Sequence, residues 1–328
     1  MKNKLFTILA LVISLNIFAQ YDVDINKTKR VTGKERRNNE QQKREETGGC
    51  KFIPFHDYAV GMKFYFPIDN SKLRFDEYGY DKYYSVEQIK KNKFQINKIK
   101  YKNISGKLFE IIKIEERKPG YREDTYITLK QVDSSFTIEH KSMFDRIFLK
   151  SQWEKDETDG QVSVLPDAIY TGEIDSFKEK FLNKEFYSKV LVKGKRYQKV
   201  KIIEVGAGTE NQPIRAVVIN EKGDKEQIDF CTCGTNVSSV YLYSNTMNNY
   251  FSTENPKDKF KGKDENWDLI CEKKLKIGFT EDELRWSWGG PDSINETTVS
   301  GRQHKQFVYS NQYVYLENGI VTSFQSSK

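Results

Sequence analysis

Four cysteines carry the most reactive side chains of this sequence: Cys50, Cys231, Cys233 and Cys271. In a chain that is exported, as the N-terminal residues discussed below indicate, an even number of cysteines first predicts disulfides. Cys231 and Cys233 are separated by one residue and are too close to pair comfortably with each other. We therefore expect cross-pairs to Cys50 and Cys271, which would fix the start of the folded region and the C-terminal module to the middle of the chain.

Two other states of these cysteines stay open. Four thiolates can hold a zinc ion in tetrahedral geometry, so the same four residues are also candidate metal ligands. The single residue between Cys231 and Cys233 is a tighter spacing than zinc sites usually have. Thiols without a partner are the third state. We expect no cofactor, and zinc is the alternative.

The sequence contains no pattern of an established catalytic class. Its histidines, His56, His140 and His304, stand in separate segments without ligand spacing. The metalloprotease pattern HExxH, the hydrolase pattern GxSxG and the glycine-rich nucleotide-binding patterns are absent. Acidic residues are numerous, but two of them indicate a glycosidase only when their geometry is known. We expect a protein without catalytic activity, and the alternative is a secreted hydrolase acting on glycan or peptide.

The N-terminal residues 1–20 have the three parts of a signal peptide. Lys2 and Lys4 form the positive region, Leu5 to Phe18 form the apolar region, and Ala19 supplies the small residue before the cut. The apolar run is shorter than the roughly 20 residues that a membrane span needs. The mature chain is therefore expected to be exported and to lack a transmembrane helix. Because no cysteine follows the cut closely, we expect no lipid anchor.

The mature chain is expected in the periplasm, at the outer membrane or outside the cell. Residues 21–49 contain almost no apolar side chain and are predicted to be a disordered polar linker. The sequence has 54 Lys and Arg against 47 Asp and Glu, for a net charge of +7, and the two signs are interspersed. This pattern is typical of a solvated mixed surface. Together with export, it excludes nucleic acid as an expected partner.

The middle of the chain contains a duplicated β unit, with residues 50–150 as the first copy and 151–260 as the second. The segment GKLFEIIKIEE at 106–116 is similar to GKRYQKVKIIE at 194–204. Apolar residues alternate in both, at Ile112 and Ile114 in the first copy and at Val200 and Ile202 in the second, which predicts half-buried strands. The match continues downstream, where 127, 129 and 138 correspond to 217, 219 and 228. The first copy also carries a tyrosine-rich insert and a predicted helix after Ser85.

These strands bounded by glycine predict two small barrel-like units. They resemble duplicated SH3-type β modules. Such modules would bind glycan, peptide or a protein partner, or would act as spacers without a ligand.

The C-terminal module, residues 261–328, has the clearest local signals. A helix is predicted at 265–274, and Thr280 with Glu283 forms a capping box for a second helix. Gly289, Gly290 and Pro291 stop that helix. Strands are predicted at 306–309, 313–316 and 320–324, and Asn318-Gly319 predicts the hairpin between the last two. The overall fold class is therefore α+β, mainly β, with two duplicated β units followed by two helices and a three- or four-stranded antiparallel sheet.

The C-terminal module resembles the SmpA/OmlA (BamE-like) family of outer-membrane assembly lipoproteins. The resemblance rests on the segment 277–280, on Glu283, on the turn at 289–292, and on the strands at 306–309 and 316–321. It covers about 60 residues, and this chain lacks the lipidated cysteine and carries a long N-terminal extension. The resemblance implies an α+β module that makes protein–protein contacts in the cell envelope and performs no catalysis.

We therefore expect a non-catalytic binding or scaffold protein of the cell envelope. Its expected partners are other envelope proteins or peptidoglycan and related glycans. Exposed aromatic residues often dominate such contacts. The candidates are Tyr78, Tyr80, Tyr83 and Tyr84 of the insert, and Trp286 and Trp288 of the C-terminal module.

Overall fold

The computed structural model describes residues 50–74, 82–85, 99–117, 124–142, 144, 146–154, 162–238, 246–299, 301–310 and 312–326. Several predictions fall outside these residues. They are the signal peptide of residues 1–20, the linker of residues 21–49, Tyr78 and Tyr80, and the helix expected after Ser85.

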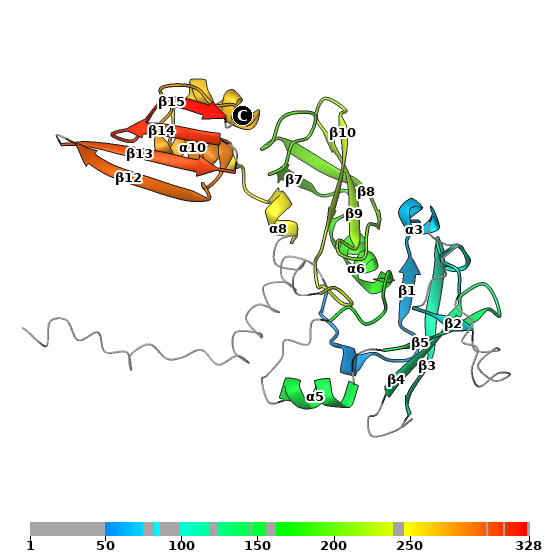
Figure 1. Ribbon diagram of the computed structural model, residues 1–328. Coiled ribbons are helices and arrows are strands. Elements are labelled where there is room, and N and C mark those ends of the chain that lie inside the picture. The colour runs from blue at the N-terminus through cyan, green and yellow to red at the C-terminus, as the bar shows by residue number, and fades with distance from the viewer. Residues whose placement is uncertain are drawn as a thin grey trace, which may run out of the picture. The chain divides into compact units, whose positions relative to one another are not determined.

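Three antiparallel sheets, joined by short helices, make up most of the described residues (Figure 1). The predicted class, α+β and mainly β, is confirmed. Each sheet ends in two edge strands, so the described strands form open sheets where we expected barrel-like units. None of the helices in the described ranges combines the length and the apolar character that crossing a bilayer requires.

The first sheet has the strand order β2-β5-β4-β3-β1-β6. Its strands are β1 (Lys63–Phe66), β2 (Tyr84–Ser85), β3 (Lys107–Arg117), β4 (Asp124–Gln131), β5 (Thr137–Lys141) and β6 (Ile169–Tyr170). The helices of this part are η1 (Phe55–Asp57), α3 (Asn70–Arg74), η3 (Tyr101–Asn103) and α5 (Arg146–Glu154). Aromatic residues fill the core, and Phe66 packs edge to face against both Tyr83 and Phe109.

The second sheet has the order β10-β9-β8-β7-β11 and is preceded by helix α6. Its elements are α6 (Thr171–Phe181), β7 (Glu185–Ser188), β8 (Lys199–Ala207), β9 (Ile214–Asn220), β10 (Lys225–Phe230), α8 (Met247–Tyr250) and β11 (Phe251–Ser252). Phe177 of α6 lies in the core of this sheet against Phe230. Helix α6 follows β6 of the first sheet without an intervening residue, so it joins the two β units directly.

The two sheets share a strand arrangement, which supports the interpretation of an internal repeat. The order β1-β3-β4-β5 in the first matches β7-β8-β9-β10 in the second. The long strand of each copy also has an irregular register, between Ile111 and Lys113 in β3 and between Ile202 and Glu204 in β8. The position of a β-bulge reflects local geometry that a duplicated unit would keep.

The bulges change which residues face the core. We predicted Ile112 and Ile114 on the buried face of β3, but Ile112 is 41% exposed, and Phe109 and Ile111 are buried instead. In β9 the aligned residue Val217 is only half-buried, whereas its neighbours in the sequence fill the core. A shift of one residue moves every side chain to the other face of a strand. The strands were therefore predicted correctly, but some of their faces were not.

The third sheet, in the C-terminal module, has the order β12-β13-β14-β15. Its strands are β12 (Ser293–Val299), β13 (Arg302–Tyr309), β14 (Gln312–Glu317) and β15 (Ile320–Ser326). The preceding helices are η4 (Pro256–Lys259), η5 (Asp264–Asn266), α9 (Trp267–Cys271) and α10 (Glu281–Trp288). The capping box of Thr280 and Glu283 is present, and α10 ends at Gly289, whose φ is 88°. The first strand, β12, extends the three strands that we predicted.

Arg196 joins the second β unit to the C-terminal module. Its guanidinium donates to the carbonyl oxygens of Trp286 and Ser287, which belong to the last turn of α10. Its backbone N–H donates to the carbonyl oxygen of Cys271 at 2.9 Å. Carbonyl groups at the end of a helix have no partner within the helix, and a cation there also suits the helix dipole. Arg196 therefore caps α10 from another part of the chain.

Candidate functional site

A cavity of about 1030 Å³ lies where the first sheet meets α6 and the loop that connects β8 to β9. Its lining combines apolar side chains with charged and amide groups. It consists of Tyr65, Pro67, Ile68, Asp69, Asn70, Ser71, Lys72, Leu108, Thr171, Ile174, Asp175, Ala207, Gly208, Thr209, Glu210, Asn211 and Arg215. A large concave site with a few convergent polar groups is the usual place for a ligand.

Two carboxyl groups meet at the edge of this cavity. Asp167 lies just before β6 and its side chain is 1% exposed, whereas Glu210 lines the cavity from the β8–β9 loop. The backbone N–H of Asp167 donates to Glu210 Oε2 at 2.8 Å, and the two side chains are also hydrogen-bonded to each other. Asp167 has a φ of 62°, in the left-handed region that aspartate tolerates better than most residues.

Two lysines neutralise this pair. Lys72 of α3 contacts Asp167 Oδ1, and its Nζ lies 3.8 Å from Glu210 Oε2. The Nζ of Lys82 lies 3.5 Å from Asp167 Oδ2. Asp69 accepts hydrogen bonds from the backbone and hydroxyl of Ser71 at the start of α3, at 2.8 and 2.6 Å. These bonds fix the first turn of α3, which is part of the lining of the cavity.

The two carboxyl groups titrate differently. Burial, together with the hydrogen bond to Glu210, raises the pKa of Asp167 to about 7. Burial by itself would raise the pKa of Glu210 as well, but the hydrogen bond from Asp167 and the charge of Lys72 hold that pKa below its usual value. The pair therefore holds a proton on Asp167 below about pH 7, and Glu210 presents a negative charge to the cavity.

The cations of the lining are occupied by carboxylates, which leaves the cavity acidic. Arg215 forms a bidentate pair with Asp229, with Nε–Oδ1 and Nη2–Oδ2 distances of 2.9 and 2.7 Å. Lys72 contacts Asp167, and its Nζ also lies 3.7 Å from Asp69 Oδ2 and 3.8 Å from Glu210 Oε2. Asp175 on α6 is exposed at the cavity and takes part in no hydrogen bond or ion pair within the described ranges. The lining therefore favours a ligand with a positive charge.

The loop at 231–237 connects both β units to the turn that carries Asp167. Asn236 is 3% exposed, and its Oδ1 accepts from the backbone N–H groups of Val164 and Leu165, both at 2.8 Å. Its Nδ2 donates to the carbonyl oxygens of Leu165 and Ala168 at 2.8 and 2.7 Å. All the hydrogen-bonding capacity of this amide is thus used to fix the turn at 164–168.

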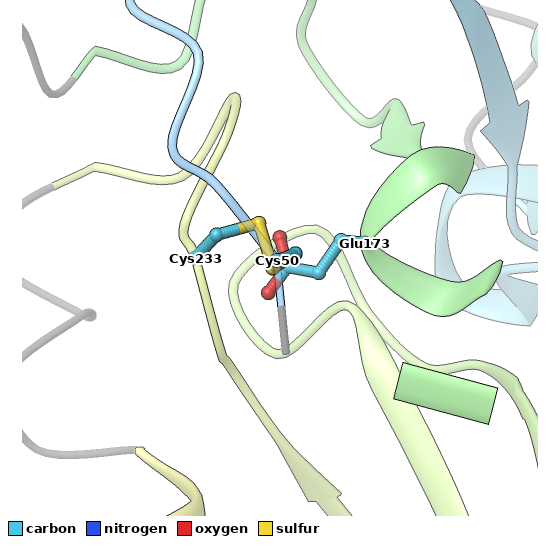
Figure 2. A group of neighbouring side chains, drawn as sticks. All are labelled: Cys50, Glu173 and Cys233. Carbon is cyan, nitrogen blue, oxygen red and sulfur yellow. A yellow bond between two sulfur atoms is a disulfide. The ribbon is translucent and has the colours of Figure 1, made fainter. Parts of the chain in front are cut away.

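The same loop carries a disulfide and a buried carboxylate (Figure 2). Cys233 is bonded to Cys50, and both are buried. Glu173 reaches toward them from the first turn of α6 and is fully buried. It accepts hydrogen bonds from the backbone N–H groups of Thr232 and Gly234, at 2.6 and 3.2 Å, and from the hydroxyl of Thr232 at 2.9 Å. Burial raises the pKa of Glu173 above its usual value.

The other two cysteines are thiols and are not brought together. Cys231 is buried, and its Sγ donates to Glu173 Oε1 at 3.6 Å. Cys271 lies in α9 of the C-terminal module, where burial raises its pKa to about 11. The second cross-pair that we expected is therefore not formed, and the four cysteines do not converge on one four-sulfur site. The physical reason is that Cys271 is buried in α9, where its carbonyl oxygen accepts from the backbone N–H of Arg196.

The candidate contact residues lie mostly in packed surroundings. Tyr83 is fully buried and its hydroxyl donates to the carbonyl oxygen of Pro166 at 2.8 Å, so it is not available for contact. Tyr84 is half-buried in β2. Trp286 packs against Tyr197, and Trp288 donates its indole N–H to the carbonyl oxygen of Lys273 at 2.9 Å. Both tryptophans support the C-terminal core.

Sequence reasoning did not find the cavity residues. Glu210 belongs to GAGTENQP, a segment that reads as an ordinary turn, and Asp167 follows a proline in another unremarkable loop. Their separation of 43 residues gives no signal of contact. Only folding brings them together.

Comparison with known proteins adds no relative. No protein-family model matches the chain, and neither a curated protein nor a solved structure is similar to it.

Proposed function

We propose that this chain is an exported, non-catalytic binding protein of the cell envelope, and that its cavity binds an amine-bearing peptide segment. The acidic lining carries the proposal. Three carboxylates, Asp69, Asp175 and Glu210, line the cavity. Of its two cations, Arg215 is paired with Asp229, and Lys72 lies against Asp69, Asp167 and Glu210, so the lining carries an excess of negative charge. An ammonium group is the ligand chemistry that this charge distribution favours.

The apolar part of the lining supports a peptide over a free amine. Ile68 is 67% exposed at the cavity, and Leu108 and Ile174 line it as well. An aliphatic side chain next to an ammonium group would contact both parts of the lining. Peptides of the cell wall and segments of envelope proteins both carry such groups, in agreement with the partners expected from the sequence.

Hydrolysis is the second candidate function, and the Asp167–Glu210 pair is the observation that favours it. Two points argue against it. Glycosidases keep their two carboxyl groups about 5 to 9.5 Å apart, whereas these two are in hydrogen-bond contact. Asp167 is also only 1% exposed and is held by Lys72, so a substrate would not reach it.

The test is calorimetric titration of the purified chain with a short lysine-containing aliphatic peptide and with purified wall peptides. We expect binding that is lost when the amines are acetylated and that is weakened in Asp175→Asn. Asp282→Asn, which changes an exposed aspartate on α10, is the matched control. Binding that does not depend on the amine would contradict the proposal. A shortened peptide in the mass spectrum after incubation would establish hydrolysis instead.

A further inference from the structure

The Cys50–Cys233 disulfide and Glu173 bring three metal-ligating atoms together (Figure 2). One carboxylate oxygen of Glu173 and the two sulfur atoms all lie within 4.8 Å of one another, and all three residues are buried. Their segments are far apart in the sequence: the start of the folded region, the first turn of α6 and the loop after β10. The fold therefore brings this cluster together, and none of its three residues lines the cavity described above.

The surroundings of Glu173 are those of a carboxylate without a counter-ion. Within the described ranges, no lysine, arginine or histidine forms an ion pair with it. Its donors are neutral: two backbone N–H groups, the hydroxyl of Thr232 and the thiol of Cys231. A buried charge is normally paired with an opposite charge or with a metal ion. Glu173 Oε2 accepts a single bond, from Gly234, and keeps a lone pair.

We propose that reduction of the Cys50–Cys233 disulfide converts this cluster into a Zn²⁺ site. The ligands are the two thiolates, one oxygen of Glu173 and, in the fourth position, the thiolate of Cys231. Zinc takes four sulfur, nitrogen or carboxylate ligands in tetrahedral geometry. Cys231 supplies a further thiol beside the cluster, because its Sγ lies 3.6 Å from Glu173 Oε1. It lies outside the group of three atoms that are all within 4.8 Å of one another, so its side chain would turn toward the metal on binding. The peptide N–H groups on Glu173 would then orient the ligating carboxylate from behind.

Reduction of the Cys50–Cys233 disulfide needs an external dithiol as the reductant. A dithiol transfers two electrons and two protons to the Cys50–Cys233 bond, which gives two thiols, and the dithiol itself becomes a disulfide. Binding of Zn²⁺ then releases the protons of the three thiols. Cys50 stays attached to the loop after β10 in the oxidised and in the reduced chain. The link is the disulfide in the oxidised chain and the Zn²⁺ ion in the reduced chain, so the contact would be kept in oxidising and in reducing surroundings.

The test uses the full mature chain, with and without treatment by a dithiol under native conditions. Intact mass after alkylation reports the disulfide, and metal analysis after dialysis against Zn²⁺ reports the stoichiometry. We expect one Zn²⁺ per reduced chain and none per oxidised chain. Competition with a colorimetric chelator then gives the affinity. Glu173→Gln and Cys231→Ser each remove a proposed ligand and should weaken the Zn²⁺ affinity. Removal of a group that only hydrogen-bonds to a metal ligand typically costs roughly 10- to 100-fold in affinity, so we expect at least that loss here.

Two variants are matched controls. Cys271→Ser removes a buried thiol outside the cluster, and Glu283→Gln changes another buried glutamate in the first turn of a helix. Both should bind Zn²⁺ like the wild type, even if they lose stability. A disulfide that resists the dithiol unless the chain is unfolded, a reduced chain without bound zinc, or unchanged affinity in Glu173→Gln would each overturn the proposal. Unchanged affinity in Cys231→Ser would overturn the assignment of the fourth ligand.

Discussion

The backbone N–H of Asp167 donates to Glu210 Oε2 at 2.8 Å, while the side chains of the same two residues are hydrogen-bonded to each other. One loop is thus bound twice to another at the edge of the cavity. The raised pKa of Asp167, about 7, makes this contact sensitive to pH.

The stability of the protein should depend on Asp167 between about pH 5 and 7. In this range the folded chain keeps a proton on Asp167 that the unfolded chain releases, since the ordinary pKa of the group is 3.8. The free energy of unfolding should therefore fall as pH rises, by at most about 1.4 kcal/mol per pH unit, and level off above the folded pKa. Asp167→Asn should flatten this dependence. Urea unfolding at several pH values measures it, with Asp282→Asn as the control. Equal slopes in wild type and Asp167→Asn would refute the assignment.

Asn236 should be one of the most sensitive positions in the chain. Asn236→Ala removes four hydrogen bonds to backbone groups of the turn at 164–168, and each buried group left without a partner costs about 1–3 kcal/mol. We expect a loss of about 3 kcal/mol or more in chemical denaturation. Asn183→Ala is the matched control, because Asn183 has the same backbone conformation, with φ of 66° against 64°, but is exposed. A similar loss in both variants would mean that backbone strain, and not the amide, decides the effect.

Arg196 should couple the C-terminal module to the second β unit. Arg196→Ala removes the donor of the Ser287 carbonyl oxygen and one of the two donors of the Trp286 carbonyl oxygen, which also accepts from the hydroxyl of Tyr197. The loss should cost about 1–3 kcal/mol. Because the lost contacts lie between two parts of the chain, the C-terminal module should also unfold at a lower temperature than the rest. Calorimetry would show this as two transitions. Arg302→Ala removes only a surface pair with Glu317, so its effect should be within about 0.5 kcal/mol. A single, unshifted transition in Arg196→Ala would contradict the coupling.

The disulfide should stabilise the oxidised chain mainly through the length of the loop that it closes. Cys50 and Cys233 are 183 positions apart, for which loop-closure entropy corresponds to about 5 kcal/mol. Cys50→Ala should therefore lose several times more stability than Cys231→Ala, although each removes one buried sulfur. Equilibrium unfolding of both variants in the absence of reductant makes the comparison. Equal losses would indicate that packing, and not the covalent link, sets the contribution.

The sequence by itself determined the local features of this protein. Thr280 and Glu283 cap α10, Gly289 ends it, and Asn318-Gly319 connects β14 to β15 as predicted. The mainly β class followed from alternating apolar residues in segments bounded by glycine. Such features depend on residues within a few positions of one another. The hydrogen-bonding capacity and backbone preference of those residues are therefore enough to predict them.

Only the tertiary structure decided the faces of the strands, the partner of each cysteine and the candidate site. A bulge between Ile111 and Lys113 turned Ile112 away from the core, whereas Ile114 packs against it as expected, and no residue type predicts such a bulge. Cys50 had two expected partners by sequence, Cys231 and Cys233, and packing against the loop after β10 selected Cys233. Asp167, Glu210 and Glu173 acquire their properties from burial and from partners far away in the chain. The energy of a buried carboxyl group depends on what surrounds it, and that is fixed only when the chain has folded.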